Sequence, residues 1–456
     1  NYELTTEITL GKGNTGGLLL FYDEKAYAGV ASDGKTFTIY RNGEKTETMP
    51  SDYHKHFHLR LLNRANRVTL SASKDGKSWK ELATDIDVSG LHHNNYGGFY
   101  ALRPALLSTG KGRTTFRNFT YRDATPQEKD MAAYLMVFHQ DEDHCLHAAI
   151  SRDGYTFTAL NDGKPIIAGD TIADQKGIRD PHIYRGPDGG FYLAMTDLHI
   201  YAQRDGYRDT EWERDGKTYG WGNNRGLVLM KSFDLIHWTR TNIRFDQMSK
   251  EFAQIGCAWA PETVYDPVTG RMMIYFTMRF GTEQNRLYYV YVNQDFNRIE
   301  SIPQILFEYP SGASAIDGDI TPIWNEERQK MEYHLFYVAH ESGSGIKQAV
   351  SDRIDGGYRF DPRWIDFEPV ACEAPNVWKR IGEDKWVLMY DIFGINPHNF
   401  GFVETSDFVH FKNLGRFNEG VMKTTNFRSP KHGAVIHLTQ EEADRLENYW
   451  NGKKQK

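Results

Sequence analysis

A repeat of about 55 residues most limits what the second part of this chain can fold into. Each unit has an apolar, aromatic strand, a second strand, and a Ser/Asp turn followed by an aromatic residue, as in "GLVLMKSFDLIHW", "FGFVETSDFVHF" and "LHAAISRDGYTF". The strands that open successive units begin near Asp180, Glu262, Asp317, Glu373 and His432, at intervals of 82, 55, 56 and 59 residues. Four-stranded units of about 50 residues are typical of β-propeller blades. Five starts therefore predict five blades.

Both ends of the repeat region are incomplete units. The segment "AYLMVFHQDEDHCLHAAISRDGYTF" precedes the first start, and little chain follows the last start, "HGAVIHLT". A closed ring without a free sheet edge is simplest if these two ends share one blade. Beyond the last strand, Thr439 and Glu442 have the spacing of a capping box, which predicts a short terminal helix.

Residues 1–124 follow a different pattern, with about eight or nine short strands and frequent turns, which is typical of a β-sandwich. The polar stretch "YRDATPQEKDMAAYL" separates the two patterns, so we place the boundary at residues 122–130 and the second domain at 131–456. The prediction is an all-β chain, an N-terminal β-sandwich followed by a five-bladed β-propeller. Because the first residues already alternate like a strand and lack an initiating Met, we expect a trimmed product whose sandwich is N-terminally incomplete.

Composition narrows the classes of function. The net charge of −7 comes without a basic cluster, which argues against nucleic acid as a partner. No apolar run approaches the roughly 18 residues of a membrane span. Aromatic residues make up 14% of the chain, as is common in strand-rich and in sugar-binding proteins. Cys145, Cys257 and Cys372 fit neither a metal spacing nor a disulfide framework, so we expect buried free thiols.

Carboxylates recur where the blades begin: Asp180 in "RDPHI", Glu262 in "WAPETV", Asp317 in "AIDGDI" and Glu373 in "CEAPNV". The first strand of a blade lines the central channel, so these residues are expected to converge on one rim. Gathered carboxylates repel one another and are costly to desolvate, so they indicate a cation, a hydrogen-bond network or chemistry. Capping of a strand end could explain any one of them, but it explains four at matching positions less well.

The succession "RDP", "WAPE", "IDGD" and "EAP", each opening a blade, resembles glycoside hydrolase family 43, and so does "SPKHGAVIHLT". The resemblance covers residues 131–440. It implies an inverting glycosidase in which Asp180 is the general base and Glu373 the general acid. Asp317 would raise the pKa of the acid and hold it in position. Asp319 points to the same side of its strand and is the alternative for this third role.

The implied chemistry is consistent with blades arranged around a channel. Inversion needs an acid and a base on opposite sides of the anomeric carbon, roughly 6.5–9.5 Å apart, which separate blades can supply. A third carboxylate close to the acid would keep it protonated near neutral pH. The N-terminal part resembles the β-sandwich module that often accompanies these enzymes. In the family that module usually follows the propeller, whereas here it precedes it. The sandwich could therefore serve this propeller or another one further upstream.

Five further residues are candidates for contact with substrate or a metal. Trp259 either stacks on a sugar or packs in the core, and Glu262 either binds substrate or holds a strand start. Arg428 is a candidate for contact with a sugar hydroxyl, although a loop arginine is more often solvated. Trp221 belongs to a long aromatic insertion that is expected to wall off one end of a cleft. His432 would point into the channel, where the resemblance implies a histidine that helps hold a metal or water. A structural calcium ion and a satisfied buried histidine are the two alternatives, and no cofactor is expected to be required.

We therefore expect an exo-acting α-L-arabinofuranosidase on plant cell-wall polysaccharide. A β-D-xylosidase, a β-galactose-cleaving enzyme and an endo-arabinanase are alternatives. A non-catalytic sugar-binding propeller is the alternative from another class. The expected partners are arabinose- or xylose-containing polysaccharides or oligosaccharides. A polymeric substrate implies a secreted, periplasmic or cell-surface location.

Overall fold

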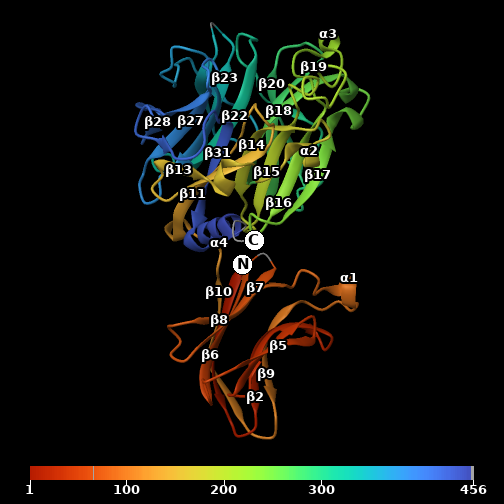
Figure 1. The fold of residues 1–456 in the computed structure, drawn as a ribbon, viewed down its shortest axis with the longest axis vertical. Helices are drawn as coiled ribbons and strands as arrows, with labels where there is room; N and C mark the ends of the chain where they lie inside the picture. Colours follow the sequence, from red (N-terminus) through yellow and green to blue (C-terminus); the bar gives the residue numbers. More distant parts are fainter. Residues whose placement is uncertain (65, 342, 453–456) are drawn as a thin grey trace. The chain divides into compact units, whose positions relative to one another are not determined.

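The computed structural model describes residues 1–64, 66–341 and 343–452, and the chain divides into two compact units, Asn1–Pro126 and Gln127–Lys456. Regular structure in both units is almost entirely β-strand (Figure 1). Within the described part of the chain, no helix combines the length and the apolar character needed to cross a membrane.

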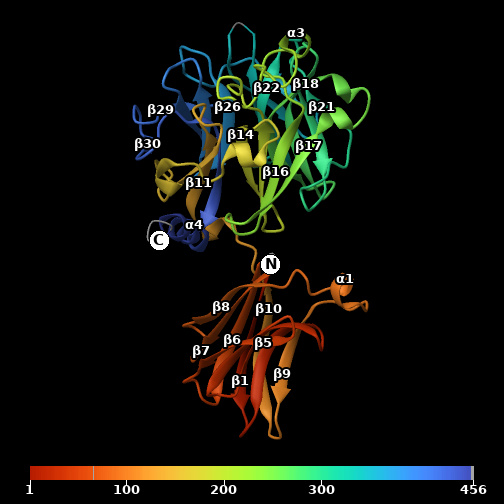
Figure 2. The ribbon, with the colours of Figure 1, turned by 45° about the vertical axis from the view of Figure 1, so that its right-hand side comes forward.

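Unit 1 is a sandwich of two five-stranded sheets (Figure 2), with strand orders β10-β1-β6-β7-β8 and β5-β4-β3-β2-β9. Its strands alternate between buried and partly exposed positions, so the inward residues of both sheets form a single apolar core. This confirms the predicted sandwich. A short helix, α1 (His93–Tyr96), lies between β8 and β9. The strands are β1 (Tyr2–Leu10), β2 (Thr15–Asp23), β3 (Ala26–Ser32), β4 (Thr36–Arg41), β5 (Glu44–Pro50), β6 (His56–Arg64), β7 (Arg67–Ser73), β8 (Lys80–Asp87), β9 (Arg103–Thr109) and β10 (Thr114–Asp123).

Unit 2 consists of five sheets that follow one another along the chain. Four of them are formed by consecutive strands: β14 (Ile178–Arg185), β15 (Phe191–Asp197), β16 (Gly226–Ser232) and β17 (Trp238–Arg244); β18 (Ile255–Asp266), β19 (Arg271–Phe280), β20 (Arg286–Val292) and β21 (Gln304–Phe307); β22 (Ala315–Asn325), β23 (Lys330–Ala339), β24 (Gly345–Ser351) and β25 (Arg359–Asp361); β26 (Glu373–Lys379), β27 (Trp386–Ile392), β28 (Asn399–Thr405) and β29 (Lys412–Arg416). Repetition of one strand pattern in the sequence thus becomes repetition of one sheet, as predicted.

The fifth sheet joins the two ends of the unit, in the order β30-β13-β12-β11-β31. It comprises β11 (Met131–His139), β12 (Leu146–Ser151), β13 (Thr156–Ala159), β30 (Lys423–Thr424) and β31 (Lys431–Thr439). Figure 1 shows β31, in blue, beside β11, in orange, and the two pair antiparallel. The first strands β31, β14, β18, β22 and β26 each contact the next around a ring. The predicted blade arrangement and shared closing blade are therefore confirmed.

Every one of these first strands carries a β-bulge near its start, where its pairing with the neighbouring strand shifts. The bulge residues have a positive φ of 40–57°: Asp180, Ala260, Asp317, Ala374 and His432. A non-glycine residue in the left-handed region is uncommon, so five at equivalent positions mark a shared feature of the blades.

The bulges divide the channel into levels that the sequence pattern did not distinguish. Glu373 lies one residue before the left-handed position, Asp180 and Asp317 occupy it, and Glu262 and Asp319 lie two residues after it. The four carboxylates expected at one level therefore occupy three.

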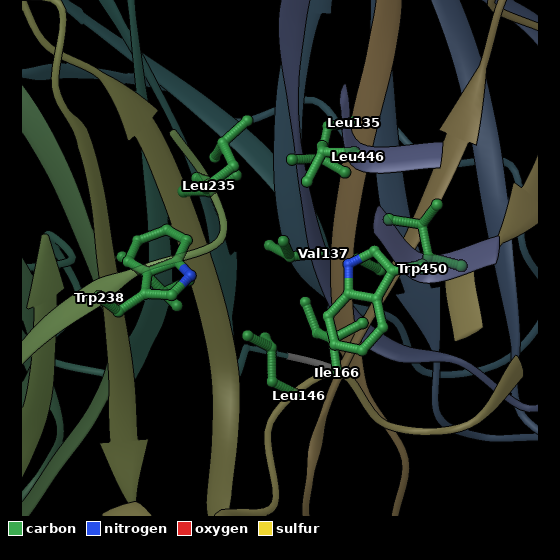
Figure 3. Close-up of a pocket in the computed structure, with 12 residues that line it drawn as sticks. Leu135, Val137, Leu146, Ile166, Leu235, Trp238, Leu446 and Trp450 are labelled. Carbon is green, nitrogen blue, oxygen red and sulfur yellow. The ribbon is translucent and has the colours of Figure 1, made fainter. Parts of the chain in front are cut away.

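The terminal helix α4 (Gln440–Gly452) begins with the predicted capping box. The Thr439 N–H donates to Glu442 Oε2 (2.8 Å), and the Glu442 N–H donates to Thr439 Oγ1 (3.3 Å). Figure 3 shows Leu446 and Trp450 of this helix facing the apolar side chains of β11 and of the adjoining sheet. The cavity between them, about 10 Å³, is too small and apolar to be a ligand site.

We expect Leu446→Ala to lower the free energy of unfolding by about 2–5 kcal/mol, because this side chain is 2% exposed and its removal leaves a cavity. Urea denaturation of the variant measures the loss. Ile302→Ala, at a position that is 65% exposed, is the control and should change stability by less than about 0.5 kcal/mol. Equal stability of Leu446→Ala and the parent would contradict this packing role.

Candidate active site

The backbone of each bulge is fixed by the preceding blade. The N–H groups of four left-handed residues donate to side chains on the second strand of that blade, in the pairs Asp180 to His139 Nδ1 (3.1 Å), Ala260 to Thr196 Oγ1 (2.8 Å), Asp317 to Thr277 Oγ1 (3.0 Å) and His432 to Asp391 Oδ2 (3.2 Å). The four acceptors occupy equivalent ladder positions. Satisfying a buried N–H in this way stabilises a backbone conformation that is otherwise unfavourable.

The fifth interface departs from this rule. Val338 occupies the corresponding position of β23, opposite Ile316, and an apolar side chain accepts no hydrogen bond. The Ala374 N–H donates instead to Asp317 Oδ2 (3.3 Å). The carboxylate of Asp317 is thereby held against the backbone of the residue that follows Glu373.

Asp180 is a buried carboxylate in a positive environment. Its Oδ2 accepts from Thr196 Oγ1 (2.7 Å), and its Oδ1 lies 3.3 Å from His432 Nδ1 and 4.0 Å from Arg179 Nε. Burial raises the pKa of Asp180, but the His432 and Arg179 charges outweigh it, so the pKa lies well below its usual range. Asp180 is therefore ionised at neutral pH, as a general base must be.

Glu373 is held by a buried lysine. Lys431 Nζ donates to Glu373 Oε1 (2.9 Å) and lies 3.1 Å from Asp391 Oδ2. Burial raises the pKa of Glu373, but Lys431 reverses this effect and the net shift is downward. Lys431 and His432 are consecutive, so one strand start contacts Glu373 on one side and Asp180 on the other. Asp180 and Glu373 therefore lie at the same mouth of the channel, on the two blades that flank β31.

Asp317 carries the proton of this group. Burial, together with repulsion from Glu373 and Asp180, raises the pKa of Asp317 to about 7, although His432 opposes the shift. We expected this repulsion to keep Glu373 protonated. In the free protein it acts on Asp317 instead, because Lys431 stabilises the charge of Glu373. Below about pH 7 the Asp317–Glu373 pair holds one proton, mainly on Asp317, and it loses this proton as pH rises through about 7.

Of the two deeper carboxylates, Asp319 connects two blades and Glu262 is bonded within its own sheet. Asp319 Oδ2 accepts from Asn376 Nδ2 (2.9 Å) and from the Val377 N–H (3.1 Å) of the next blade. Glu262 is 3% exposed, and its Oε2 accepts from the Tyr275 hydroxyl (2.7 Å). The structure thus brings Asp317, and not Asp319, beside Glu373, and it places Glu262 two residues deeper than the bulge.

Residues 129–444, well over half of the chain, match a family described as a probable glycosyl hydrolase domain, related to glycosyl hydrolase family 43. The chain belongs to this family. The family-43-related glycosyl hydrolase is accordingly a glycosidase, which hydrolyses O-glycosyl bonds.

One curated relative of this glycosyl hydrolase is an α-L-arabinofuranosidase of Bifidobacterium longum subsp. longum, 28% identical over 193 residues. That match covers 40% of this chain and 16% of the relative, so the chain spans only a small part of the relative's length. Similar solved structures include an α-L-arabinofuranosidase from Clostridium thermocellum (12% identity, 59% of this chain and 82% of that chain, TM-score 0.40). Another is a xylan β-1,4-xylosidase from Bacillus halodurans (12% identity, 64% and 54%, TM-score 0.43).

His432 is the candidate metal ligand of this glycosyl hydrolase. Its Nδ1 lies 3.3 Å from Asp180 Oδ1, which raises the pKa of the imidazole, so a metal would have to be held through Nε2. A calcium ion takes six to eight oxygen ligands. In the described ranges, no group of three or more His, Cys, Asp or Glu side chains is arranged to hold a metal ion. No step below depends on one.

The remaining candidates lie at the rim or outside it. Trp259 precedes the bulge of β18, at the level of Glu373, and its Nε1–H donates to the Gly222 carbonyl (3.0 Å) of the insertion. Trp221 of that insertion is 58% exposed. Arg428 is exposed, and its carbonyl accepts from Gln140 Nε2 (2.6 Å); its side chain is not brought to the carboxylates by any contact of the described residues.

Sequence reasoning missed two charged residues that shape the site of this glycosyl hydrolase. Arg179 is 8% exposed, pairs with Asp141 and lies beside Asp180. Lys431 is 4% exposed and pairs with Glu373. Each directly precedes a left-handed residue, so the repeat alignment that found the carboxylates also contained them. Cys257 and Cys372 are buried free thiols as expected, and Cys145 is only partly buried.

Proposed function

We propose that this glycosidase is an exo-acting, inverting α-L-arabinofuranosidase. The observation that carries the catalytic roles is that Lys431 and His432 contact Glu373 and Asp180 from one strand start. An ionised carboxylate and a carboxyl group that shares a proton with a neighbour then flank the same mouth. Such a pair is what single-displacement hydrolysis requires.

In this mechanism Asp180 removes a proton from a water molecule, and the water oxygen bonds to the anomeric carbon. The bond from that carbon to the glycosidic oxygen breaks, and this oxygen takes a proton from Glu373. The products are a sugar of inverted anomeric configuration and an alcohol. Arg179 is buried, and its Nε lies 4.0 Å from Asp180 Oδ1, where the guanidinium is placed to orient a sugar hydroxyl.

The proton that Glu373 delivers comes from the pair it forms with Asp317. In the free protein Lys431 favours ionised Glu373 and protonated Asp317. A leaving-group oxygen that approaches Glu373 accepts a hydrogen bond only from its protonated form. Substrate binding therefore favours the arrangement in which the shared proton lies on Glu373.

We expect kcat/KM to fall as pH rises through about 7, because the Asp317–Glu373 pair loses its last proton there. The acidic limb belongs to Asp180 and lies well below the usual range of an aspartate. Asp317→Asn should move the basic limb to lower pH, because it removes the group whose raised pKa keeps a proton on the pair up to about pH 7 and leaves Glu373, whose pKa Lys431 lowers. A pH–rate profile of both proteins measures this, and a basic limb that stays in place would contradict the coupling.

Arabinofuranose is proposed as the sugar because the curated relative bears that name. Xylose is the alternative, since a similar structure is named a xylosidase. Nitrophenyl α-L-arabinofuranoside, β-D-xyloside and β-D-galactoside, tested side by side with arabinan, identify the sugar. Proton NMR of the first-formed product tests inversion, and a retained anomer would contradict the roles of Asp180 and Glu373. Absence of hydrolysis on every substrate would favour a sugar-binding protein.

A further inference from the structure

The insertion between β15 and β16 presents one exposed tryptophan on a rigid turn. Trp221 lies between Gly220 (φ 83°) and Gly222 (φ 61°), two left-handed positions that suit glycine. A Cβ on Gly220 would lie 2.7 Å from Arg279 Nη2, and one on Gly222 would lie 3.2 Å from the Trp259 ring. This turn therefore approaches β18 and β19 more closely than other residues would allow.

Arg279 of β19 fastens this turn. It is 6% exposed, and its Nη2 donates to the carbonyls of Trp221 (2.8 Å) and Tyr219 (3.1 Å). Its guanidinium also lies 4.6 Å from the ring centre of Trp259. One buried cation thus binds the backbone on which Trp221 is mounted and covers one face of Trp259. The backbone is fixed while the Trp221 ring stays exposed.

Three indole rings form a continuous array on this support. Trp212 and Trp221 have ring centres 5.3 Å apart, and Trp221 and Trp259 have ring centres 5.8 Å apart. The hydroxyl of Thr196 links the strand that carries Trp259 to the carboxylate of Asp180. Thr196 Oγ1 accepts from the N–H of Ala260, the residue after Trp259, and donates to Asp180 Oδ2. Trp259 therefore stands beside the reaction site, and Trp212 and Trp221 extend outward from it.

Trp221 is exposed, and it packs edge to face against Trp212 and Trp259, which are partly buried. An exposed indole on a fixed backbone is costly in water unless it binds something. Sugar rings present flat faces of C–H groups that pack against indole faces. In an exo-acting enzyme the terminal sugar occupies the buried end of the site, so a surface that extends outward meets the rest of the chain.

We propose that Trp212, Trp221 and Trp259 bind the sugar residues on the leaving-group side of the cleaved bond, and that Arg279 is the positioning residue for this subsite. The inference rests on the proposed function and extends it. The preferred substrate is then an oligosaccharide or polymer, and a glycoside with a small leaving group does not use this subsite.

The test compares arabino-oligosaccharides with nitrophenyl arabinofuranoside. Trp221→Ala should raise KM for the oligosaccharide about ten-fold or more, because a ring of this size loses its buried area in the complex. Its kcat, and both constants for the nitrophenyl glycoside, should stay within about two-fold. Arg279→Met should give the same split and make the insertion more sensitive to proteolysis.

Trp324→Ala is the matched control, since this tryptophan is 48% exposed on β22, seven residues beyond Asp317. It should leave all four constants unchanged. Equal effects of Trp221→Ala on both substrates, or no effect on either, would overturn the subsite.

A binding experiment separates this proposal from the proposed function. Glu373→Gln, with and without Trp221→Ala, is titrated with arabino-oligosaccharides and xylo-oligosaccharides by calorimetry. Weaker oligosaccharide binding in the double variant supports the subsite even if the protein hydrolyses nothing. Equal binding in the two variants rejects it, even if hydrolysis is observed.

Discussion

Asp180→Asn should lower kcat/KM by roughly 10²–10⁴-fold on every substrate, whereas Glu373→Gln should do so only where the leaving group needs a proton. The base acts on water, and every glycoside needs that step. The acid acts on the glycosidic oxygen, and a dinitrophenolate leaves without protonation. Glu373→Gln should therefore lower kcat/KM by roughly 10²–10⁴-fold on an arabino-oligosaccharide and by less than about ten-fold on a dinitrophenyl glycoside.

Steady-state kinetics of the two variants on both substrates measures this contrast. Asp319→Asn is a useful comparison, because that residue connects blades through Asn376 and Val377 and should affect stability more than leaving-group dependence. The assignment of roles would be reversed if Asp180→Asn, and not Glu373→Gln, recovered with the better leaving group. Equal falls in kcat/KM for both variants on both substrates would contradict the assignment of Glu373 as the general acid.

Lys431→Met should lower the free energy of unfolding by about 3–5 kcal/mol, because it leaves Glu373 and Asp391 buried without their shared cation. With Lys431 present, the folded-state pKa of Glu373 is lowered, so its stabilisation is present above about pH 4.5 and is lost as pH falls. In the variant, burial raises the pKa of both carboxyl groups, and protonation relieves the cost. The difference from the parent should therefore shrink as pH falls toward about 5.

The same variant should shift the pH–rate profile. Without the cation that lowers it, the pKa of Glu373 rises, so the basic limb moves to higher pH, opposite to the shift expected for Asp317→Asn. Urea denaturation at several pH values and the pH profile of kcat/KM are the two measurements.

Lys347→Met is the control for this lysine. Lys347 is also 4% exposed, but it donates to the Tyr309 hydroxyl (2.8 Å), away from the catalytic carboxylates. The Lys347→Met variant should be less stable than the parent, but the basic limb of its kcat/KM profile should stay at the same pH. A profile that moves equally in both lysine variants would show that the shift follows from general loosening of the fold.

Much of this architecture was predictable because it depends on local patterns. The regular spacing of the strands predicted the blades, and the two incomplete units at the ends of the repeat predicted the sheet that they share. Thr439 and Glu442 satisfy each other's backbone groups within one turn, so their spacing alone predicts the helix start. The convergence of Asp180, Asp317 and Glu373 followed from ring closure.

The levels within the channel were not predictable in the same way. A bulge adds one residue to a strand, and a sequence pattern does not reveal which residue is added until the pairing register is known. For that reason Glu262 and Asp180 looked equivalent. The ionisation of Glu373 was also missed, because it depends on Lys431, a residue 58 positions away that reaches it from another blade.

The apolar side chain of Val338 has a consequence for Asp317, which supplies the hydrogen-bond acceptor that Val338 lacks. Because a valine occupies the position where the other blades have a polar acceptor, the carboxylate proposed to share a proton with Glu373 also accepts from the Ala374 N–H and so links the third and fourth four-stranded sheets. Chemistry and assembly are thus tied to one side chain. Asp317→Ala would remove both the titrating group and the acceptor of a buried N–H, whereas Asp317→Asn would keep an oxygen that can accept from Ala374. Loss of activity in the alanine variant alone would therefore reflect weaker association of the two sheets and not the loss of a proton.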